Sequence, residues 1–306
     1  MPYTKQNHAK ADFDRVYVSE TPHLYVAQMA RFGYQIGEQA RPYCAAAADL
    51  LRQKNGEAWP VQMLDIGCSY GMGSAFIKYG CSFDELVAFF TSRAPKEFRA
   101  ACEAMRMWLN VTPPACDVRC VGLDSSKPAI RYAVEAGLLD GGIARNFEDH
   151  GVEPSTEEIA WFRSCNLLIC TGAIGYVTDR TLGVVLQHLG KDYPAEFGPF
   201  AVVTVLRMFD ETPIADCFDR YGLRFQRVPG ARLPQRRFTD GEERDRVLSV
   251  LHDHGIDTSA WEDRGRHYAD LFIAAPPEQH AILLDRMTRS RDEIEEQSSE
   301  PAYLQR

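Results

Sequence analysis

Short apolar runs alternate with helical patterns along most of the chain. The runs predict strands at 61–66, 118–124, 167–171, 200–206, 223–228 and 268–274. Apolar residues at helical spacing predict helices within 13–54, from Ser74 onward, within 84–108, at 127–138, at 179–190 and after Pro277, the last with Ile282, Leu283 and Met287 on one face. Strands that alternate with helices predict an α/β fold, in which helices cover both faces of a mostly parallel sheet.

Composition and charge narrow the class of protein. The 306 residues are 45% hydrophobic, enough for one large or two small domains with a sizeable core. The sequence has 34 basic and 43 acidic residues, so its net charge is −9. A negative net charge argues against a nucleic acid or an anionic membrane as partner. Residues 1–8 are polar, with no signal-peptide core, and no apolar run reaches the length of a membrane span. We therefore expect a cytoplasmic protein.

The nine cysteines do not form a recognisable metal or redox motif. There is no CxxC pair, and no histidines follow at zinc-finger spacing. We expect reduced cysteines that pack as small apolar side chains, and a protein that works without a metal ion.

A glycine-rich turn follows the first predicted strand. It reads Asp65-Ile-Gly-Cys-Ser-Tyr-Gly-Met-Gly, and its small residues would let a ligand approach the backbone at the start of the next helix. Neither register of the turn completes the GxGxxG of a dinucleotide site. The segment from Gly67 to Gly71 also matches GxSxG, so a serine hydrolase with Ser69 as nucleophile is an alternative.

Four segments, in order, resemble class I S-adenosyl-L-methionine (SAM)-dependent methyltransferases. They are 64–71, 121–124, 145–148 and 166–171, and the similarity covers about residues 60–210. The resemblance implies a doubly wound seven-stranded sheet with an N-terminal helical lid and helical insertions, SAM as cofactor and S-adenosylhomocysteine as product. The sequence departs from the family at Ser69, where GxGxG has its middle glycine.

The resemblance also implies roles for individual residues. The glycine loop would lie under the methionyl part and the ribose, with Asp65 orienting that loop or binding the amino group. Asp124 would accept hydrogen bonds from the ribose hydroxyls, and Asn146 and Phe147 would flank the adenine. The cofactor residues implied in this way are Asp65, Gly67, Cys68, Ser69, Gly71, Asp124, Ser125, Asn146, Phe147, Thr171 and Gly172.

Candidate acceptor residues lie outside the glycine loop. Tyr17, Tyr25 and Tyr34 could form an aromatic cage or pack in the core. Tyr176 lies on a glycine-containing loop that follows the strand at 167–171. Residues 220–237 contain six arginines and no acid. Arg232 and Arg236 could hold an anionic acceptor, or the arginines could face solvent or pair with the acids nearby at 240–245.

A general base would be useful for an amine or hydroxyl acceptor, whereas a carboxylate or thioether requires none. The candidates for that role are Tyr176, His23 and Asp179, although Asp179 could instead cap a helix.

The expected organisation places a lid and substrate segment at 1–59 and a SAM-binding domain at 60–277. That domain would carry a helical insertion at 81–115 and a substrate-side insertion at 207–246, and a helical tail would follow at 278–306.

The expected function is metal-independent, in-line methyl transfer to a small molecule in biosynthesis. The favoured methyl acceptor is an amino acid or a carboxylate-bearing metabolite. The accepting atom can be oxygen, nitrogen or sulfur, and a methionine-like thioether is one of the possibilities. A SAM-binding protein without transfer activity is a further alternative. A homodimer is left open.

Overall fold

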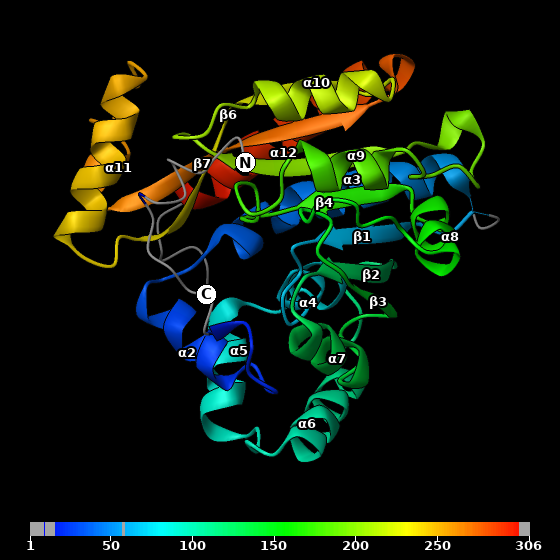
Figure 1. Ribbon diagram of the computed structural model, residues 1–306, viewed down its shortest axis with the longest axis vertical. Helices are drawn as coiled ribbons and strands as arrows, with labels where there is room; N and C mark the ends of the chain where they lie inside the picture. Colours follow the sequence, from blue (N-terminus) through cyan, green and yellow to red (C-terminus); the bar gives the residue numbers. More distant parts are fainter. Residues whose placement is uncertain (1–8, 10–15, 57–58, 300–306) are drawn as a thin grey trace.

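A seven-stranded sheet organises the part of the chain that the computed structural model describes, which is residues 9, 16–56 and 59–299 (Figure 1). The strands are β1 Gln62–Ile66, β2 Arg119–Asp124, β3 Gly141–Ala144, β4 Leu167–Cys170, β5 Phe200–Leu206, β6 Arg224–Arg237 and β7 Arg266–Ala275. Their order in the sheet is β3-β2-β1-β4-β5-β7-β6. The first five strands are parallel, and β7 runs antiparallel to both of its neighbours. The predicted doubly wound, mostly parallel sheet is confirmed.

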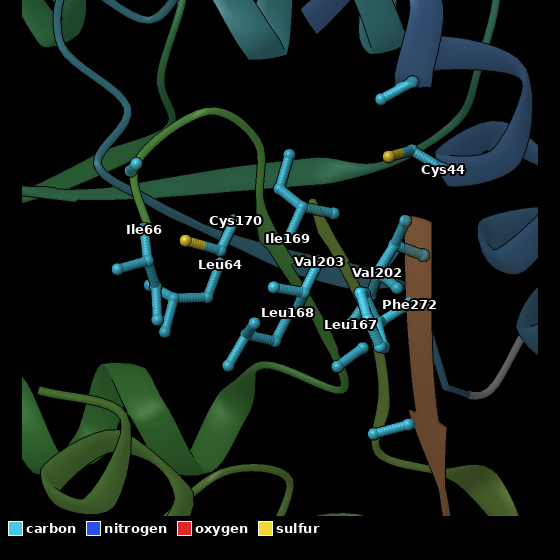
Figure 2. Packing of buried hydrophobic residues seen from close by; sticks show 14 of the residues in the cluster. Cys44, Leu64, Ile66, Leu167, Leu168, Ile169, Cys170, Val202, Val203 and Phe272 are labelled. Carbon is cyan, nitrogen blue, oxygen red and sulfur yellow. The ribbon is translucent and has the colours of Figure 1, made fainter. Parts of the chain in front are cut away.

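The central strands form where the sequence is continuously apolar. Every residue of β4 and β5 is buried, as expected for parallel strands covered on both faces. Figure 2 shows side chains of β1, β4 and β5 close together, with Leu64, Leu168 and Val203 among them. Because these strands are fixed by packing on both sides, the loops at their carboxyl ends are held in place.

Helices cover both faces of the sheet. Those described are α2 His23–Arg31, α3 Ile36–Asn55, α4 Met72–Tyr79, α5 Phe83–Ser92, α6 Phe98–Asn110, α7 Lys127–Glu135, α8 Thr156–Ser164, α9 Asp179–Leu186, α10 Thr212–Arg220, α11 Gly241–Asp253 and α12 Pro277–Ser299. Helices α3, α4 and α12 pack together, and so do α8, α9 and α10. Right-handed crossovers place these two groups on opposite faces, because β1 to β2 and β4 to β5 advance in opposite directions across the sheet.

Helices α2 and α5 pack against each other beside the sheet, and α6 packs against α7 (Figure 1). These elements enclose a second apolar cluster, to which Tyr25, Phe76, Phe90 and Tyr132 contribute. The cluster joins residues before β1 to the segment at 81–115. Within the described residues, no helix combines the length and apolar character needed to cross a membrane.

Several elements differ from the sequence-based expectations. The helix expected to reach 138 ends at Glu135, and Gly141 and Gly142, expected to stop it, begin strand β3. A Cβ at Gly141 would lie 2.9 Å from the Trp161 ring, so the glycine allows α8 to approach the sheet. Strand β6 runs far beyond the expected 223–228. Helices α8, α10 and α11 were not predicted.

The predictions for the two ends of the chain are tested only in part, and one of them is wrong. Residues 13–15 of the expected first helical region lie outside the described residues, as do 1–8 and 300–306. The tail helix is present as α12, but its three apolar residues do not share a face. Leu283 and Met287 are buried one turn apart, whereas the Ile282 side chain is 53% exposed. Ile282 is only one residue from Leu283, so the helical twist of about 100° turns it away.

Candidate functional site

A cavity of about 420 Å³ opens at the carboxyl ends of β1, β2 and β4, where ligands bind in open α/β sheets. Twelve residues predicted from the sequence to bind cofactor or substrate line it. They are Tyr17, Tyr25, Tyr34, Gly67, Ser69, Asp124, Ser125, Asn146, Phe147, Thr171, Gly172 and Tyr176. These residues come from separate parts of the chain, and the sheet brings them to one edge.

The loop after β1 turns through left-handed backbone conformations. Gly67 has φ +73° and Gly71 has φ +77°. A Cβ at Gly67 would lie 2.3 Å from the Cβ of Ala173, so only glycine fits there. Ser69 has φ +49° and is the one described non-glycine residue with positive φ, a conformation that costs roughly 1–2 kcal/mol for residues with a Cβ. Ser69 is among the residues that line the cavity, but its Oγ is buried and has no hydrogen-bond partner among the described residues.

Asp124 ends β2 and connects two edges of the cavity. Its Oδ2 accepts the backbone N–H of Ser69 at 2.9 Å, and its Oδ1 accepts that of Ser126 at 2.8 Å. Burial raises the pKa of Asp124, while the hydrogen bonds from Ser126 and Ser69 oppose that change. Each carboxylate oxygen has a further lone pair that could accept a hydrogen bond from a ligand hydroxyl.

Asp65 lies behind the glycine loop and does not line the cavity. A Cβ at Gly73, in the first turn of α4, would lie 2.5 Å from its Oδ2, so the carboxyl packs against the start of that helix. Oδ2 is buried without a partner among the described residues. Burial, followed by the nearby charge of Asp124, raises the pKa of Asp65 to about 7.

The raised pKa of Asp65 predicts a pH-dependent stability. The unfolded chain releases this proton near pH 4, whereas the native state keeps it until about pH 7. The free energy of unfolding should therefore fall between about pH 5 and about pH 8, and Asp65→Asn should flatten that fall. Urea unfolding at both pH values measures the difference, with the exposed Asp117→Asn as control. An unchanged pH dependence in Asp65→Asn would show that Asp65 ionises normally.

Carboxyl groups occupy the N-terminal ends of three helices around the cavity. Asp65 lies against the start of α4, and Asp124 accepts the N–H of Ser126, the N-cap of α7. Glu148 accepts the N–H of Thr178, the N-cap of α9, at 2.9 Å and the hydroxyl of Thr181 at 2.5 Å. Helix N-termini attract anions, so the chain's own carboxyl groups already fill these positions.

Tyrosines cover the cavity on the side of the N-terminal segment. The rings of Tyr17 and Tyr25 lie 5.6 Å apart, and burial raises the pKa of both phenols above their usual value. The Tyr70 hydroxyl lies 2.8 Å from the carbonyl of Ser19, and the Ser126 hydroxyl donates to the carbonyl of Tyr17. These contacts fasten the segment that carries Tyr17 to the glycine loop and to the end of β2.

Tyr34 is positioned by strand β6. The N–H of Gln35 donates to the carbonyl of Gln235 at 2.7 Å, and the N–H of Arg237 donates to the carbonyl of Phe32 at 2.8 Å. The loop between α2 and α3 therefore adds to the strand, and it holds the Tyr34 hydroxyl near Gly172. Burial raises the pKa of the Tyr34 phenol as well, so its hydroxyl stays protonated at neutral pH.

No protein-family model and no curated protein matches this sequence. Solved structures that resemble it include a TehB-like SAM-dependent methyltransferase from Corynebacterium glutamicum, 13% identical over 74% of this chain and 86% of that one, with a TM-score of 0.34. Phosphoethanolamine N-methyltransferase 2 of Haemonchus contortus, in complex with SAM, is 12% identical over 76% and 52%, with a TM-score of 0.35. A SAM-dependent methyltransferase from Thiobacillus denitrificans, in complex with S-adenosylhomocysteine, is 12% identical over 75% and 90%, with a TM-score of 0.30.

The strand order and direction decide the fold. The chain has the class I methyltransferase fold. In this fold, the cavity occupies the position where the resemblance places SAM, beside the loop after β1 and the acid that ends β2.

Other predicted residues lie outside the lining of the methyltransferase-fold cavity. Cys68 packs beneath the loop against Gly122, and Gly71 packs against Ala133 and Leu138. The imidazole of His23 contacts the hydroxyl of Thr21 at 3.0 Å and the carbonyl of Ala94 at 3.1 Å. These contacts hold His23 away from the cavity.

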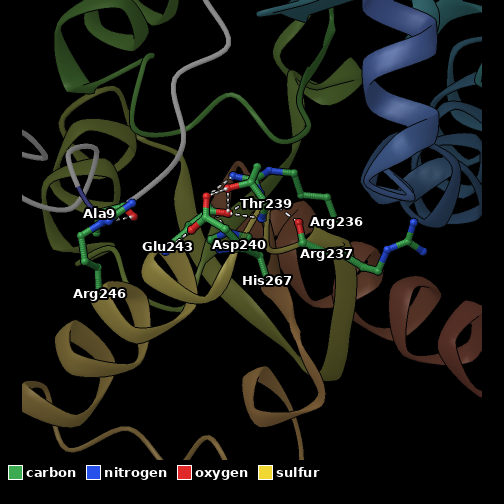
Figure 3. A network of polar contacts seen from close by, with 8 residues as sticks. All are labelled: Ala9, Arg236, Arg237, Thr239, Asp240, Glu243, Arg246 and His267. Atoms are coloured by element: carbon green, nitrogen blue, oxygen red, sulfur yellow. Dashed lines mark hydrogen bonds and ion pairs between the residues drawn. The ribbon is translucent and has the colours of Figure 1, made fainter.

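Asp179, Arg232 and Arg236 also lie outside the cavity lining. Asp179 is the first residue of α9. Arg232 pairs with Asp270 at 2.6 Å and lies over the Trp261 ring, and Arg236 pairs with Glu243 at 2.6 Å (Figure 3). Both arginines thus bind acids of the chain itself.

Sequence reasoning missed several residues that line the cavity. These are Val18, Ile66, Leu123, Ser126, Arg145, Glu148, Ala173, Val177 and Thr181. Arg145 and Glu148 belong to the segment 145–148 that resembles the family's adenine-contacting segment, although neither was given a role of its own in the sequence-based predictions. Thr181 lies close to one helical turn after Thr178, a spacing that places both beside Glu148.

The described site lacks the partners that a serine nucleophile needs. No histidine is among the residues that line the cavity, and Ser69 Oγ has no hydrogen-bond partner in the described part of the chain. The described residues also contain no group of three or more His, Cys, Asp or Glu side chains that could hold a metal ion.

Proposed function

We propose that this protein binds SAM in the cavity and transfers its methyl group to a small-molecule acceptor. The observation that carries the proposal is the convergence of Asp124 with the glycine loop at the carboxyl edge of the sheet. The carboxylate of Asp124 suits the two ribose hydroxyls, and the bare backbone at Gly67 lets the ligand approach. Asn146 and Phe147 line the cavity beyond Asp124, where the adenine would lie.

The cofactor supplies the reactive methyl group on a sulfonium, and the protein supplies orientation and a dry site. Tyr17, Tyr25 and Tyr34 line the cavity. Their ring faces attract a cation, which suits the sulfonium. Their phenols are protonated at neutral pH, so they donate hydrogen bonds to a ligand and do not repel it as phenolates would.

Of the charged residues that line the cavity, Asp124 and Glu148 are acidic, and the cation Arg145 pairs with Glu158 at 3.2 Å, so these charges favour an acceptor whose reacting end is neutral or cationic. Three helix N-termini are filled by Asp65, Asp124 and Glu148. Arg232 and Arg236 are engaged by acids of the chain, so they do not support the anionic acceptor expected from the sequence. We therefore propose an amine, hydroxyl or thioether as the methyl acceptor.

Calorimetry and a product assay test this function. SAM and S-adenosylhomocysteine should each bind with one site per chain. S-adenosylhomocysteine should then be released in the presence of amine, hydroxyl or thioether acceptors more readily than with simple carboxylates. The absence of binding at millimolar SAM would refute the proposal. Binding without release for every acceptor class would instead identify a SAM-binding protein without transfer activity.

A further inference from the structure

The cavity offers few groups that could take a proton from a methyl acceptor. Among the described residues that line it there is no histidine, lysine or cysteine. A general base would therefore have to be a tyrosine or a carboxylate, because a guanidinium group keeps its charge. The titratable side chains in the lining are Tyr17, Tyr25, Tyr34, Tyr176, Asp124, Glu148 and Arg145.

Both carboxylates in the lining are held by other parts of the chain. Asp124 accepts the N–H groups of Ser69 and Ser126 at 2.9 and 2.8 Å, and under the proposed function it receives the ribose hydroxyls. Glu148 uses both of its oxygens at the start of α9. Its Oε1 accepts the N–H of Thr178 at 2.9 Å, and its Oε2 accepts the Thr178 hydroxyl at 2.7 Å. Each carboxylate is thus committed to contacts other than a proton transfer.

The tyrosines in the lining are poor bases but good neighbours for a cation. A phenol ionises at about pH 10, so it keeps its proton at neutral pH. Burial raises the pKa of Tyr17, Tyr25 and Tyr34 further. The rings of Tyr17 and Tyr25 lie 5.6 Å apart, and the faces of aromatic rings attract positive charge.

These side chains suit an acceptor atom that has no proton to lose. A lone pair of such an atom forms the new bond to the methyl carbon. The bond between that carbon and the sulfonium sulfur breaks, and its electron pair stays on the sulfur of S-adenosylhomocysteine. The positive charge passes to the methylated acceptor, and no proton is released. An ammonium group or a hydroxyl would also have to give up a proton, and no described lining residue is placed to take it.

We propose that the methyl acceptor is an uncharged molecule whose reacting atom bears no proton, which is a thioether sulfur or a pyridine-type nitrogen. This inference rests on the proposed function and narrows its acceptor class. The product is then a sulfonium or a pyridinium cation, which the tyrosine rings and the acids Asp124 and Glu148 favour. A carboxylate would need no base either, but the same two acids repel it.

Matched acceptors test the inference with the natural protein and SAM at about pH 7. Dimethyl sulfide and pyridine represent the two proton-free atoms, whereas methylamine and methanol represent acceptors that must lose a proton. S-adenosylhomocysteine should be released at least about tenfold faster with dimethyl sulfide or pyridine than with methylamine or methanol. The faster of the first two identifies the atom as sulfur or nitrogen. Faster release with methylamine or methanol would overturn the inference.

A binding measurement tests the cavity without turnover. N-Methylpyridinium is the product that pyridine would give, and benzoate is an anion of similar size. Calorimetry on the protein saturated with S-adenosylhomocysteine should show that the cation binds at least about tenfold more tightly than the anion, equivalent to about 1.4 kcal/mol. Equal affinity, or a preference for benzoate, would contradict a cavity that holds a cationic product.

Tyrosine variants locate the cation. Tyr17→Leu or Tyr34→Leu should weaken N-methylpyridinium binding about fivefold, as expected when an aromatic face is lost. Tyr34→Phe keeps the ring and should bind the cation normally. Tyr79→Leu changes a tyrosine outside the cavity lining and should have no effect. Thermal unfolding shows which variants are folded, and normal cation binding by folded Tyr17→Leu and Tyr34→Leu would contradict the role of the rings.

The outcomes separate this inference from the function on which it rests. If the natural protein binds neither SAM nor S-adenosylhomocysteine, the proposed function fails first. If S-adenosylhomocysteine is released only with methylamine or methanol, the proposed function stands and this inference is refuted. If none of the four small acceptors reacts, the comparison of N-methylpyridinium with benzoate decides.

Discussion

Asp124→Ala is expected to weaken SAM binding by at least about 100-fold. The carboxylate holds the N–H groups of Ser69 and Ser126, and it would accept the ribose hydroxyls as well. Hydrogen bonds to a charged group contribute about 1.5–3 kcal/mol each, so losing two ligand contacts accounts for a change of this size. The freed loop would lower the affinity further. Titration calorimetry with SAM and with S-adenosylhomocysteine measures the effect.

Two comparisons make the Asp124 result specific. Asp117→Asn changes an exposed aspartate near the opposite end of β2 and should bind SAM normally. Asp124→Asn keeps the shape of the side chain but lacks its charge, so its affinity should fall between that of the natural protein and that of Asp124→Ala. Thermal unfolding of each variant establishes that it is folded. Normal SAM binding by a folded Asp124→Ala would remove Asp124 from the site.

Glu243→Ala should destabilise the protein by about 3–5 kcal/mol. Glu243 accepts two hydrogen bonds from the guanidinium of Arg236, at 2.9 and 2.6 Å, and one from the N–H of Thr239 at 2.7 Å (Figure 3). His267 Nε2 lies 3.4 Å from the same carboxylate. Removing the acid would leave the buried guanidinium without its bidentate partner. Urea unfolding at about pH 7 measures the loss, and a change below about 1 kcal/mol would contradict it.

A double variant distinguishes the effect of leaving one charge unpaired from the effect of removing the Arg236–Glu243 ion pair altogether. Arg236→Met with Glu243→Leu replaces both charges by apolar groups, and it should recover most of the stability that Glu243→Ala loses.

The stability that the Arg236–Glu243 pair contributes should also depend on pH. Burial acts to raise the pKa of Glu243, but the hydrogen bonds from Arg236 and His267 hold it well below its usual range. The contribution of Glu243 is therefore complete above about pH 5 and declines as the pH falls below the unfolded-state pKa of about 4.5.

The sequence predicts those strands whose apolar runs are continuous. Strands β1, β2, β4 and β5 are recognisable because parallel strands buried on both faces use mostly apolar residues. Strand β3 is hidden because Gly141 and Gly142 look like a helix stop, and only the packing of neighbouring helices explains them. Strand β6 is predicted only at its start, over 223–228, for another reason. Pro229, Gly230 and Pro234 interrupt its pattern, and its pairing with β7 shifts register between Arg227 and Arg232 and again between Pro234 and Arg237.

The cofactor side of the site was predictable because its residues follow strands at fixed distances along the chain. Gly67 and Asp124 end up adjacent wherever β1 and β2 pair in parallel. The arginines differ in this respect. The pairing of Arg236 with Glu243 follows the alternative of ion pairs to the acids at 240–245, because the two residues are close in sequence, whereas the partner of Arg232 is distant. Arg232 pairs with Asp270, which β7 brings opposite it, and the β6–β7 pairing is not visible in either segment alone. The same holds for His23, whose partner Ala94 comes from the following insertion.

The position of β7 has a consequence for how the protein is made. Among the described residues this strand comes last in sequence, yet it lies between β5 and β6 and pairs with both. During synthesis, β5 and β6 therefore leave the ribosome with no strand between them, and each presents an unpaired edge until residues 266–275 follow. Strands β1 to β4 contain their own pairing partners. The half of the sheet that bears the glycine loop can thus assemble on the nascent chain, while the other half waits for the final strand.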